Sequence, residues 1–567
     1  MTSPPAHLLL HQPPRQKLTS YLNSLRSRPV AAACVVALGV RLAYVLVGSL
    51  LGGPGGMPDY WGDAYHNWIV ERLTLENGFV FTDYKGRELV WLPLFRYVAA
   101  AVMGLTGTEG LLPGRLVSLA AGVGSVGFVA AAVRRWTGRS EWALLGGLLL
   151  ALNPWHIAYS WMNMPEATGT LWIAMVFWAI APGRPPQPGS ESHNAEPDRA
   201  QSASRDPRRW DGLVLVVAGA AGALTRNDVT SVMALTAGVL LLTRRVRPAL
   251  MMLFGILIGL SIWSAWTGIV TGNPLWWLAR RAAGSTGDAG FWIVRGSRPD
   301  AGLLALIFAL VQACTVAVAA LILAGWEMRD RHTRAAFKAW QPGAPLVVAL
   351  VYTGIVGFMF TRFFSWPDPR YLVMAIVPMT IAITLMVASL RLKSAGRAAG
   401  VLIGIALLSV VIQLPSFPVR AWAHERDRIA GRAIAELESN GRIPAGLIWI
   451  DAPVAIWAAG MDLSRIRSSD QITGWGGDDG EARTSALAAI REQGIGIIYR
   501  DEVPYSRVHE IWPAMADGVP FEDDGLRFIP IFQSDTVTRP DESATLRGWR
   551  ERVQNKYGPV SIWRVER

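Results

Sequence analysis

Residues 59–68 read DYWGDAYHNW and follow the first long apolar run of the chain, residues 31–51. A run of this length suits a helix that crosses a hydrocarbon core of about 30 Å. Asp63 therefore lies just outside a predicted membrane span. A second carboxylate, Glu166, borders a later apolar run at what we predict to be the same face of the membrane. Carboxylates at the outer ends of the first spans indicate chemistry at that surface.

The composition indicates a membrane protein. The chain has 567 residues, of which 51% are hydrophobic and 17% charged, and its mean hydropathy is +0.28. This is too apolar for an ordinary soluble protein, and the chain is too long for one domain. The net charge of +11 reflects arginines that lie mainly between apolar runs. The positive-inside rule explains this distribution better than nucleic-acid binding does, so we expect a lipid bilayer as partner and no nucleic acid.

The apolar runs predict a polytopic α-helical membrane protein. A basic cytoplasmic segment, residues 1–29, precedes a transmembrane domain at 30–417. Because the bilayer sets the length of each span, we count about eleven transmembrane helices. The predicted spans are 31–51, 113–133, 141–160, 165–182, 211–224, 229–243, 248–271, 301–326, 344–362, 371–390 and 398–415.

Two loops stand out between the spans. Residues 52–112 form a predicted external loop in which 64–77 and 91–106 have helical apolar spacing but are short, so we expect helices that lie in the membrane interface. Residues 183–209 are charged and rich in Pro and Ser, which predicts a disordered cytoplasmic loop.

Residues 418–567 have short apolar runs and a high charge, which predicts a C-terminal extracytoplasmic α/β domain. The expected helices are 420–439 and 481–493, and the expected strands are 446–451, 494–500, 527–534 and 560–566. The two cysteines, Cys34 and Cys314, fall within apolar runs, so no disulfide is expected. Phosphate-loop, zinc-ligand and nucleophile-elbow motifs are absent from the sequence. The composition favours a bacterial inner membrane.

Asp63 is the strongest candidate for catalysis. Its carboxylate can act as a general base that deprotonates an acceptor hydroxyl. The alternative is that Asp59 and Asp63 only solvate a loop and cap the helix that follows. Trp61, Tyr65 and His66 surround Asp63 in the sequence and suit a sugar- or acceptor-binding site. Asp63 and His66 can also share a helical face and bind a divalent cation, so the metal requirement is left open.

Glu166 and three arginines are further candidates. Glu166 follows Pro165 at a predicted helix start, where either capping or function explains a carboxylate. Arg226, Arg362 and Arg370 fall at predicted external turns, away from the basic cytoplasmic side. Arginine pairs with phosphate in a bidentate geometry, so a phosphate is one expected partner. The alternatives are lipid headgroups or the nearby residues Asp228 and Asp368. Arg41, within the first span, is expected to be paired or structural.

The order of these motifs resembles the GT-C superfamily of integral-membrane glycosyltransferases, over about residues 30–390. The nearest branch holds the protein O-mannosyltransferases and the lipid A aminoarabinose transferases. The matching features, in chain order, are Asp63, the stretch WLPLF at 91–95, RLVSL at 115–119, RRWTGR at 134–139, Asn153-Pro154 with Ser160 and Glu166, and Arg370-Tyr371. Two features depart from the family: Asp63 lacks an adjacent acidic partner, and Leu92-Pro93 stands where Pro-Pro is usual.

The resemblance implies an inverting glycosyltransferase that takes a monosaccharide from a polyprenyl-phosphate donor on the extracytoplasmic side. It implies Asp63 as the base, Glu166 as the group that orients sugar or acceptor, and Arg370, Tyr371 and Arg226 as the donor-phosphate site. The acceptor would be a glycan, a lipid or a protein. Competing hypotheses are a transporter or lipid flippase, a polymerase or ligase of lipid-linked oligosaccharides, and a non-catalytic scaffold. A transporter predicts ionisable groups near the middle of the bilayer, which are rare in this sequence.

Overall fold

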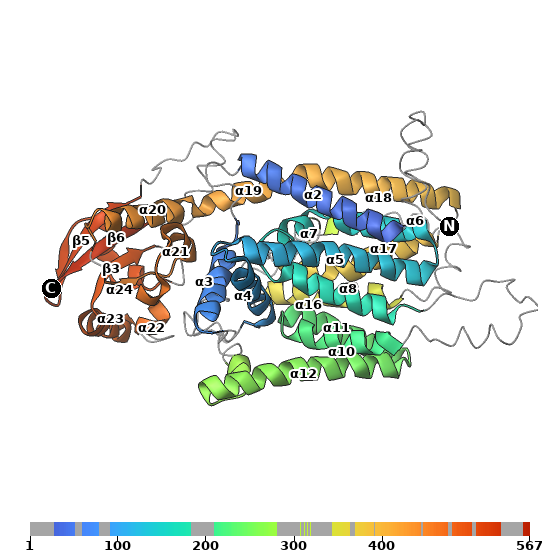
Figure 1. Cartoon of the computed structure of the whole chain (residues 1–567), viewed down its shortest axis with the longest axis horizontal. Helices are drawn as coiled ribbons and strands as arrows, with labels where there is room; N and C mark the ends of the chain where they lie inside the picture. The colour runs from blue at the N-terminus through green and yellow to red at the C-terminus, as the bar shows by residue number, and fades with distance from the viewer. Residues whose placement is uncertain are drawn as a thin grey trace, which may run out of the picture.

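The computed structural model describes residues 28–51, 59–78, 91–182, 209–279, 343–362, 369–389, 392–443, 446–473, 479–501, 506–534 and 559–567, with isolated positions between 307 and 318. It shows a bundle of helices that run side by side, with a smaller domain built on a sheet at one end (Figure 1). Residues 183–208 of the predicted disordered loop and nearly all of the predicted span at 301–326 lie outside the described residues.

The bundle is formed by helices from most of the predicted spans. They are α2 (Pro29–Leu51), α5 (Leu112–Thr137), α6 (Ser140–Ala151), α7 (Pro154–Tyr159), α8 (Glu166–Ile180), α10 (Arg209–Ala223), α11 (Asn227–Leu242), α12 (Val246–Thr271), α16 (Gly343–Arg362), the 3-10 helix η3 (Pro369–Leu372), α17 (Val373–Ala388) and α18 (Leu392–Gln413).

Five of these helical segments are long and apolar enough to cross a membrane: α2, α5, α12, η3 with α17, and α18. The helices α4 (Leu94–Thr106), α6, α8, α10, α11 and α16 are apolar but shorter. Membrane spans are therefore confirmed as the main feature of the chain, whereas the number of about eleven stays a prediction.

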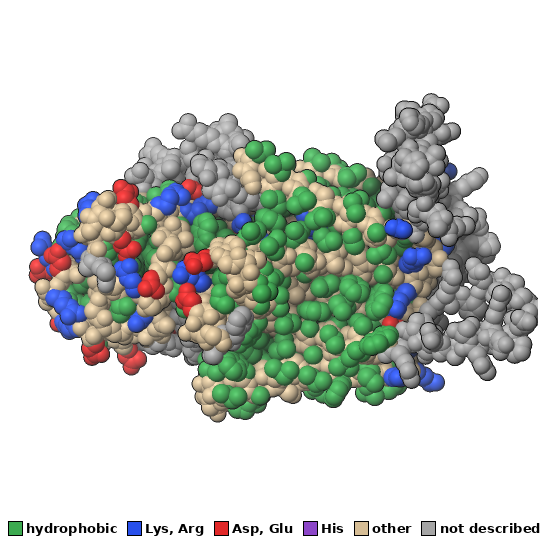
Figure 2. Space-filling model, viewed as in Figure 1, with side chains coloured by type: hydrophobic (Ala, Val, Ile, Leu, Met, Phe, Trp, Pro, Cys, Tyr) green, Lys and Arg blue, Asp and Glu red, His purple; other side chains and the backbone are tan. Residues whose placement is uncertain are grey.

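The surface of the molecule divides along its long axis (Figure 2). Hydrophobic side chains cover the bundle, whereas acidic and basic side chains mix on the C-terminal domain. A second group of Lys and Arg lies at the opposite end of the bundle. We call this opposite end, where α5 finishes in Arg134 and Arg135, the basic end, and the end against the C-terminal domain the domain end. An apolar belt between two polar ends is the surface expected for a protein embedded in a bilayer.

The predicted span at 141–160 is wrong as a single helix, because the structure divides it into α6 and α7. Pro154 lacks the backbone N–H that would continue α6 and stands instead at the first position of α7. The side chain of Asn153 caps α7 by accepting a hydrogen bond of 3.0 Å from the backbone N–H of His156. Because of this break, neither α6 nor α7 is long enough to span the membrane on its own.

Arg41 is fully buried in α2. Its guanidinium donates to the carbonyl oxygen of Ala37 at 2.9 Å and lies 2.6 Å from Nδ1 of His156 on α7. A charge inside the bundle needs such partners, since each unpaired polar group costs free energy in an apolar surrounding. These contacts support the structural interpretation of Arg41.

The C-terminal domain contains a mixed sheet of six strands in the order β2-β1-β3-β6-β5-β4. Strands β1 (Leu447–Trp449), β2 (Ile466–Arg467) and β3 (Ile495–Arg500) are parallel, and β4 (Phe521–Asp523), β5 (Leu526–Gln533) and β6 (Ser561–Glu566) continue the sheet with antiparallel pairs. Among the described residues, the α-helices of this domain and of the segment that leads into it are α19 (Ser416–Arg420), α20 (Glu425–Ser439), α21 (Pro453–Ala459), α22 (Ser469–Thr473), α23 (Asp479–Gln493) and α24 (Val508–Ile511). All four expected strands are present, and β2 and β4 were not expected because they are too short to show alternation.

The helices α3 (Gly62–Glu76) and α4 lie between the bundle and the C-terminal domain (Figure 1). They correspond to the two predicted interfacial helices. Helix α21 packs against α3, where the Trp457 ring meets the buried Tyr65 ring edge to face at 5.2 Å between centroids. The C-terminal domain thus contacts the helix that carries Asp63.

Candidate active site

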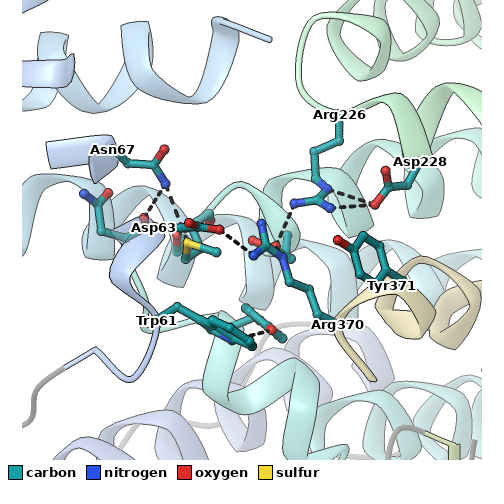
Figure 3. A network of polar contacts seen from close by, with 12 residues as sticks. Trp61, Asp63, Asn67, Arg226, Asp228, Arg370 and Tyr371 are labelled. Atoms are coloured by element: carbon teal, nitrogen blue, oxygen red, sulfur yellow. Dashed lines mark hydrogen bonds and ion pairs between the residues drawn. The ribbon is translucent and has the colours of Figure 1, made fainter. Parts of the chain in front are cut away.

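Five charged side chains from four segments meet at the domain end of the bundle (Figure 3). Three are carboxylates, each in the first turn of a helix: Asp63 in α3, Glu166 in α8 and Asp228 in α11. The partial positive charge of a helix N-terminus stabilises a carboxylate at each of these positions. The other two are guanidinium groups, Arg226 immediately before α11 and Arg370 in η3.

The five groups form one continuous chain of ion pairs. Nη1 of Arg370 lies 2.6 Å from Oδ2 of Asp63, and Nε of Arg370 lies 2.7 Å from Oε1 of Glu166. The same Glu166 oxygen accepts from Nη1 of Arg226 at 2.7 Å, and Nη2 of Arg226 lies 2.6 Å from Oδ2 of Asp228. Asp63 and Arg370 are 307 residues apart in the sequence. We call this set of five residues the ion-pair cluster.

The two carboxylates that hold Arg370 differ in exposure. The Glu166 side chain is 0% exposed, whereas the Asp63 side chain is 36% exposed. The second oxygen of Glu166, Oε2, is buried and has no hydrogen-bond partner among the residues that the structure describes. A buried carboxylate oxygen without a donor is costly, so Oε2 is the atom of Glu166 whose capacity to accept a hydrogen bond is unused.

The electrostatic surroundings of Asp63 favour its charged form. Burial by itself would raise the pKa of the Asp63 carboxyl, but the neighbouring Arg370 guanidinium outweighs burial and holds that pKa below its usual value. His66 and Arg226 act in the same direction. Asp63 is therefore ionised at neutral pH and is paired rather than free.

Aromatic groups border the cluster on one side. The guanidinium carbon of Arg370 lies 5.7 Å from the centre of the Trp61 ring, within the range of a cation–π contact. The Trp61 ring N–H donates to the Tyr159 hydroxyl at 3.0 Å, which fixes the indole. Figure 3 shows the Tyr371 ring beside Arg226 and Arg370. Trp61 and Tyr371 therefore lie where the sequence placed them, next to the charged groups.

Comparison with solved structures finds a similar fold. The chain is similar to ArnT from Cupriavidus metallidurans bound to undecaprenyl phosphate, at 14% identity over 87% of this chain and 96% of that one, with a TM-score of 0.56. The apo state of ArnT gives 14% identity over 86% and 94%, with a TM-score of 0.53. The oligosaccharyltransferase of Archaeoglobus fulgidus, tethered to an acceptor peptide, gives 9% identity over 81% and 69%, with a TM-score of 0.42.

The chain has the fold of ArnT. The resemblance that the sequence motifs indicated is thereby confirmed at the level of the fold. At 14% identity, the likeness to ArnT establishes the architecture and not the reaction. No protein-family model matches the chain, and no curated protein sequence matches it.

Within this fold, Tyr65 and His66 lie differently from Trp61. Tyr65 is 0% exposed and faces Trp457 of the C-terminal domain, so the structure does not bring it into the ion-pair cluster. Successive helix residues turn by about 100°, which puts Tyr65 on nearly the opposite side of α3 from Asp63. His66 is one turn from Asp63, and its ring stacks on Trp91 at 6.2 Å between centroids. His66 is therefore near Asp63, whereas Tyr65 lies at the interface with the C-terminal domain.

A group of buried polar side chains beneath α3 was not expected from the sequence. Asn163 is central. Its side-chain amide donates to the Ala64 carbonyl at 3.0 Å and to the Glu71 carboxylate at 3.1 Å. Its backbone carbonyl accepts a hydrogen bond of 2.9 Å from the side chain of Asn67. All three partners belong to α3, and Asn163 lies three residues before Glu166. Asn163 thus positions the helix of Asp63 relative to the start of α8.

Asp59 also belongs beneath α3. It is 1% exposed, pairs with Arg115 of α5 at 2.9 Å, and accepts a hydrogen bond of 3.3 Å from the backbone N–H of Asn163. The suggestion that Asp59 only solvates a loop is therefore wrong, because this carboxylate is buried and paired. The sequence offered one sign of the network, the stretch WMNMPE at 161–166, which places Asn163 beside Glu166.

Gly114 allows Asn163 to take this position. A Cβ atom at Gly114 would lie 1.6 Å from Oδ1 of Asn163, so alanine at this position forces Asn163 and its contacts on α3 to move. We expect Gly114→Ala to lower both the Tm and the activity, the latter by about 10²-fold, since small displacements of catalytic groups have effects of that size. Gly110→Ala is the matched control, because a Cβ there meets no atom within 4 Å. Equal Tm values for the two variants would contradict this role of Asn163.

Glu71 gives the network a pH dependence. Burial raises the pKa of Glu71 to about 8, although Asn163 and Arg96 oppose the shift. The unfolded chain releases this proton near its ordinary pKa of 4.5, so between that pH and about 8 the folded protein binds more protons. Stability therefore falls as the pH rises through this interval.

Glu71→Gln replaces the titratable carboxyl group with an amide and should remove the pH dependence of stability that Glu71 causes. We expect the Tm of the variant to rise relative to wild type from about pH 5 to about pH 8, with a change in unfolding free energy of at most about 1.4 kcal/mol per pH unit. Thermal unfolding in detergent across this range measures the difference. Parallel pH curves for the two proteins would show that Glu71 is not protonated in the folded state.

The candidate metal ligands at this site are two side chains of α3. Among the described residues, no group of three or more His, Cys, Asp or Glu side chains is arranged to hold a metal ion. Asp63 and His66 supply two candidate ligands one helical turn apart. A divalent cation therefore stays a prediction, and loss of activity in EDTA with recovery on adding a cation would support it.

Proposed function

We propose that this protein is a membrane glycosyltransferase that moves a monosaccharide from a polyprenyl-phosphate donor to an acceptor hydroxyl. The observation that carries the proposal is the ion-pair cluster at the domain end of a GT-C bundle. Further support comes from ArnT, a protein of similar fold that was solved with undecaprenyl phosphate bound. The basic end of the bundle supports a cytoplasmic location for that end, because of the positive-inside rule. The cluster then faces the outside of the membrane, in our proposal a bacterial inner membrane.

Arg226 and Arg370 are suited to bind the phosphate group of the donor. Arg226 and Arg370 both donate to the same oxygen of Glu166. Figure 3 shows the two guanidinium groups close together. Guanidinium groups pair with phosphate oxygens through two parallel hydrogen bonds. In the proposed complex, Arg370 and Arg226 bind the phosphate that links sugar to lipid, and Tyr371 lies beside it. Trp61 and His66 then border the sugar and the acceptor.

The proposed reaction is one displacement at the anomeric carbon. Asp63 accepts the proton of the acceptor hydroxyl while the acceptor oxygen bonds to the anomeric carbon. The bond from that carbon to the phosphate oxygen breaks, and its electron pair leaves with the polyprenyl phosphate. Arg370 and Arg226 stabilise the negative charge that develops on this leaving group. Glu166 orients the sugar or the acceptor through its Oε2 atom, and the product has the inverted anomeric configuration.

The donor class provides the test. Purified protein in liposomes is given one sugar in two forms, attached to polyprenyl phosphate and attached to a nucleotide, with envelope extract as the acceptor. We expect product only from the lipid-linked form, with inversion of the anomeric configuration by NMR. Product from the nucleotide sugar, or retention of configuration, would contradict the proposal. Transfer only of preassembled oligosaccharides would favour the polymerase or ligase, and lipid movement without any product would favour the flippase.

A further inference from the structure

Arg370 is shared between two carboxylates that differ in their freedom to move. Glu166 is fully buried, begins α8 and is also held by Arg226 at 2.7 Å. Asp63 is 36% exposed and contacts Arg370 through one of its oxygens, Oδ2, at 2.6 Å. An incoming anion that competes for Arg370 therefore displaces Asp63 more readily than Glu166.

We propose that the donor phosphate takes the place of Asp63 on Arg370, so that binding of the donor releases the base for catalysis. This inference rests on the proposed function and adds a mode of regulation to the same site. It assigns Asp63 two successive roles: a counter-ion of Arg370 before the donor binds, and an acceptor of the hydroxyl proton afterwards.

The geometry of Arg370 permits this exchange without moving its anchor. Nε donates to Glu166 at 2.7 Å, whereas the bond to Asp63 is made by Nη1 at the outer end of the guanidinium. When Asp63 leaves, Nε keeps its bond to Glu166 and Nη1 becomes available to a phosphate oxygen. Arginine suits such a role because its planar group presents several donors in fixed directions.

The charges of the cluster favour the exchange. The ion-pair cluster contains three carboxylates and two guanidinium groups, which leaves one negative charge in excess. A phosphate that binds beside Asp63 is repelled by it, and separating the two anions relieves the repulsion. Once Arg370 faces the phosphate, the pKa of Asp63 rises from its depressed value toward that of a useful base.

Binding order is the functional consequence. Before the donor binds, the carboxylate oxygen nearest Arg370 is occupied, so an acceptor hydroxyl meets a weak base. After the donor binds, this Asp63 oxygen no longer contacts Arg370 and can accept the proton of the acceptor hydroxyl. The acceptor therefore adds productively only to the donor complex.

A double-mutant cycle on phosphate-lipid binding tests the exchange. The probe is polyprenyl phosphate without a sugar, and the full chain is studied in nanodiscs as wild type, Asp63→Asn, Arg370→Gln and the double variant. We expect Asp63→Asn to tighten binding about ten- to one-hundredfold, because the competitor for a charged hydrogen bond is removed. In the Arg370→Gln background the same substitution should have a much smaller effect, because only the general repulsion between Asp63 and the phosphate is then removed.

Two further variants control for charge and for folding. Asp211→Asn removes a carboxylate that pairs with Arg135 at the basic end of the bundle and leaves the contact between Asp63 and Arg370 intact, so its affinity for the phosphate lipid should equal that of wild type. If Arg370→Gln is not folded, Arg370→Lys serves as the second background, because one ammonium group cannot hold Asp63 and Glu166 through a planar fork. The gain from Asp63→Asn should shrink there too.

The outcomes separate this inference from the proposed function. An unchanged affinity in Asp63→Asn overturns the exchange and leaves the donor class standing. An equal gain with and without Arg370 also overturns it, because general repulsion by Asp63 would then explain the effect. Absence of binding in wild type and in every variant overturns the polyprenyl-phosphate donor, and with it this inference.

Discussion

Asparagine in place of Asp63 is expected to lower the rate of sugar transfer by about 10³-fold, within the range that a general base contributes. The amide has nearly the shape of the carboxylate and can still meet Arg370 through its oxygen, but it cannot take a proton from the acceptor hydroxyl. The loss should appear in kcat, because Asp63 acts on the reacting proton. Transfer is measured with radiolabelled polyprenyl-phosphate sugar in liposomes.

The control for this substitution lies at the other end of the bundle. Asp211→Asn also removes a carboxylate that pairs with an arginine, Arg135 at 3.0 Å, but it is far from the proposed site. Transfer by Asp211→Asn should stay within a few-fold of wild type. A folded Asp63→Asn protein that transfers sugar at the wild-type rate would show that Asp63 is not the base.

Glutamine in place of Arg370 is expected to lower transfer by about 10²- to 10³-fold, the effect of removing one preorganised group that stabilises developing charge. The substitution also removes a contact of Asp63 at 2.6 Å and one of Glu166 at 2.7 Å. Glu166 keeps its ion pair with Arg226, so the buried carboxylate is not left without a positive partner. We therefore expect Arg370→Gln to fold, with a loss of stability that thermal unfolding will measure.

Arg370→Lys distinguishes charge from geometry. Lysine retains the positive charge but cannot bridge two carboxylates or a phosphate as the guanidinium does. Activity between that of wild type and Arg370→Gln would assign part of the effect to geometry. Arg139→Gln, at an exposed ion pair with Glu141, is the control for loss of an arginine. Wild-type transfer rates in Arg370→Gln would contradict the phosphate-binding role.

The members of the site could be predicted because the bilayer limits where loops lie. Each span reverses the chain direction, so counting spans places Asp63, Glu166, Arg226 and Arg370 at one face. Their pairing could not be predicted, since Arg370 is 204 residues from Glu166 and 307 from Asp63. The sequence offered Asp228 as one alternative partner of Arg226, and the structure shows that Arg226 binds both Asp228 and Glu166.

Other features escaped prediction for physical reasons that differ. Tyr65 was expected beside the sugar because it is near Asp63 in the sequence, but helical periodicity puts it on the other side of α3. Its contact with Trp457 of the C-terminal domain depends on tertiary packing and could not be predicted from α3 alone. For Asn163 and Glu71 the sequence offered only the position of Asn163 three residues before Glu166, and their role depends on how α3 packs on the bundle. The break after α6, in contrast, was readable from Asn153-Pro154, a common pattern at helix starts.

Sugar transfer by purified wild-type protein and the folded Asp63→Asn variant, assayed side by side with a polyprenyl-phosphate sugar donor, tests the central claim most directly. The account predicts labelled product from wild type and from Asp211→Asn, with about 10³-fold less from Asp63→Asn. Equal product from Asp63→Asn and wild type, or none from wild type with any lipid-linked donor, would contradict the assignment of the ion-pair cluster as the centre of a glycosyltransferase.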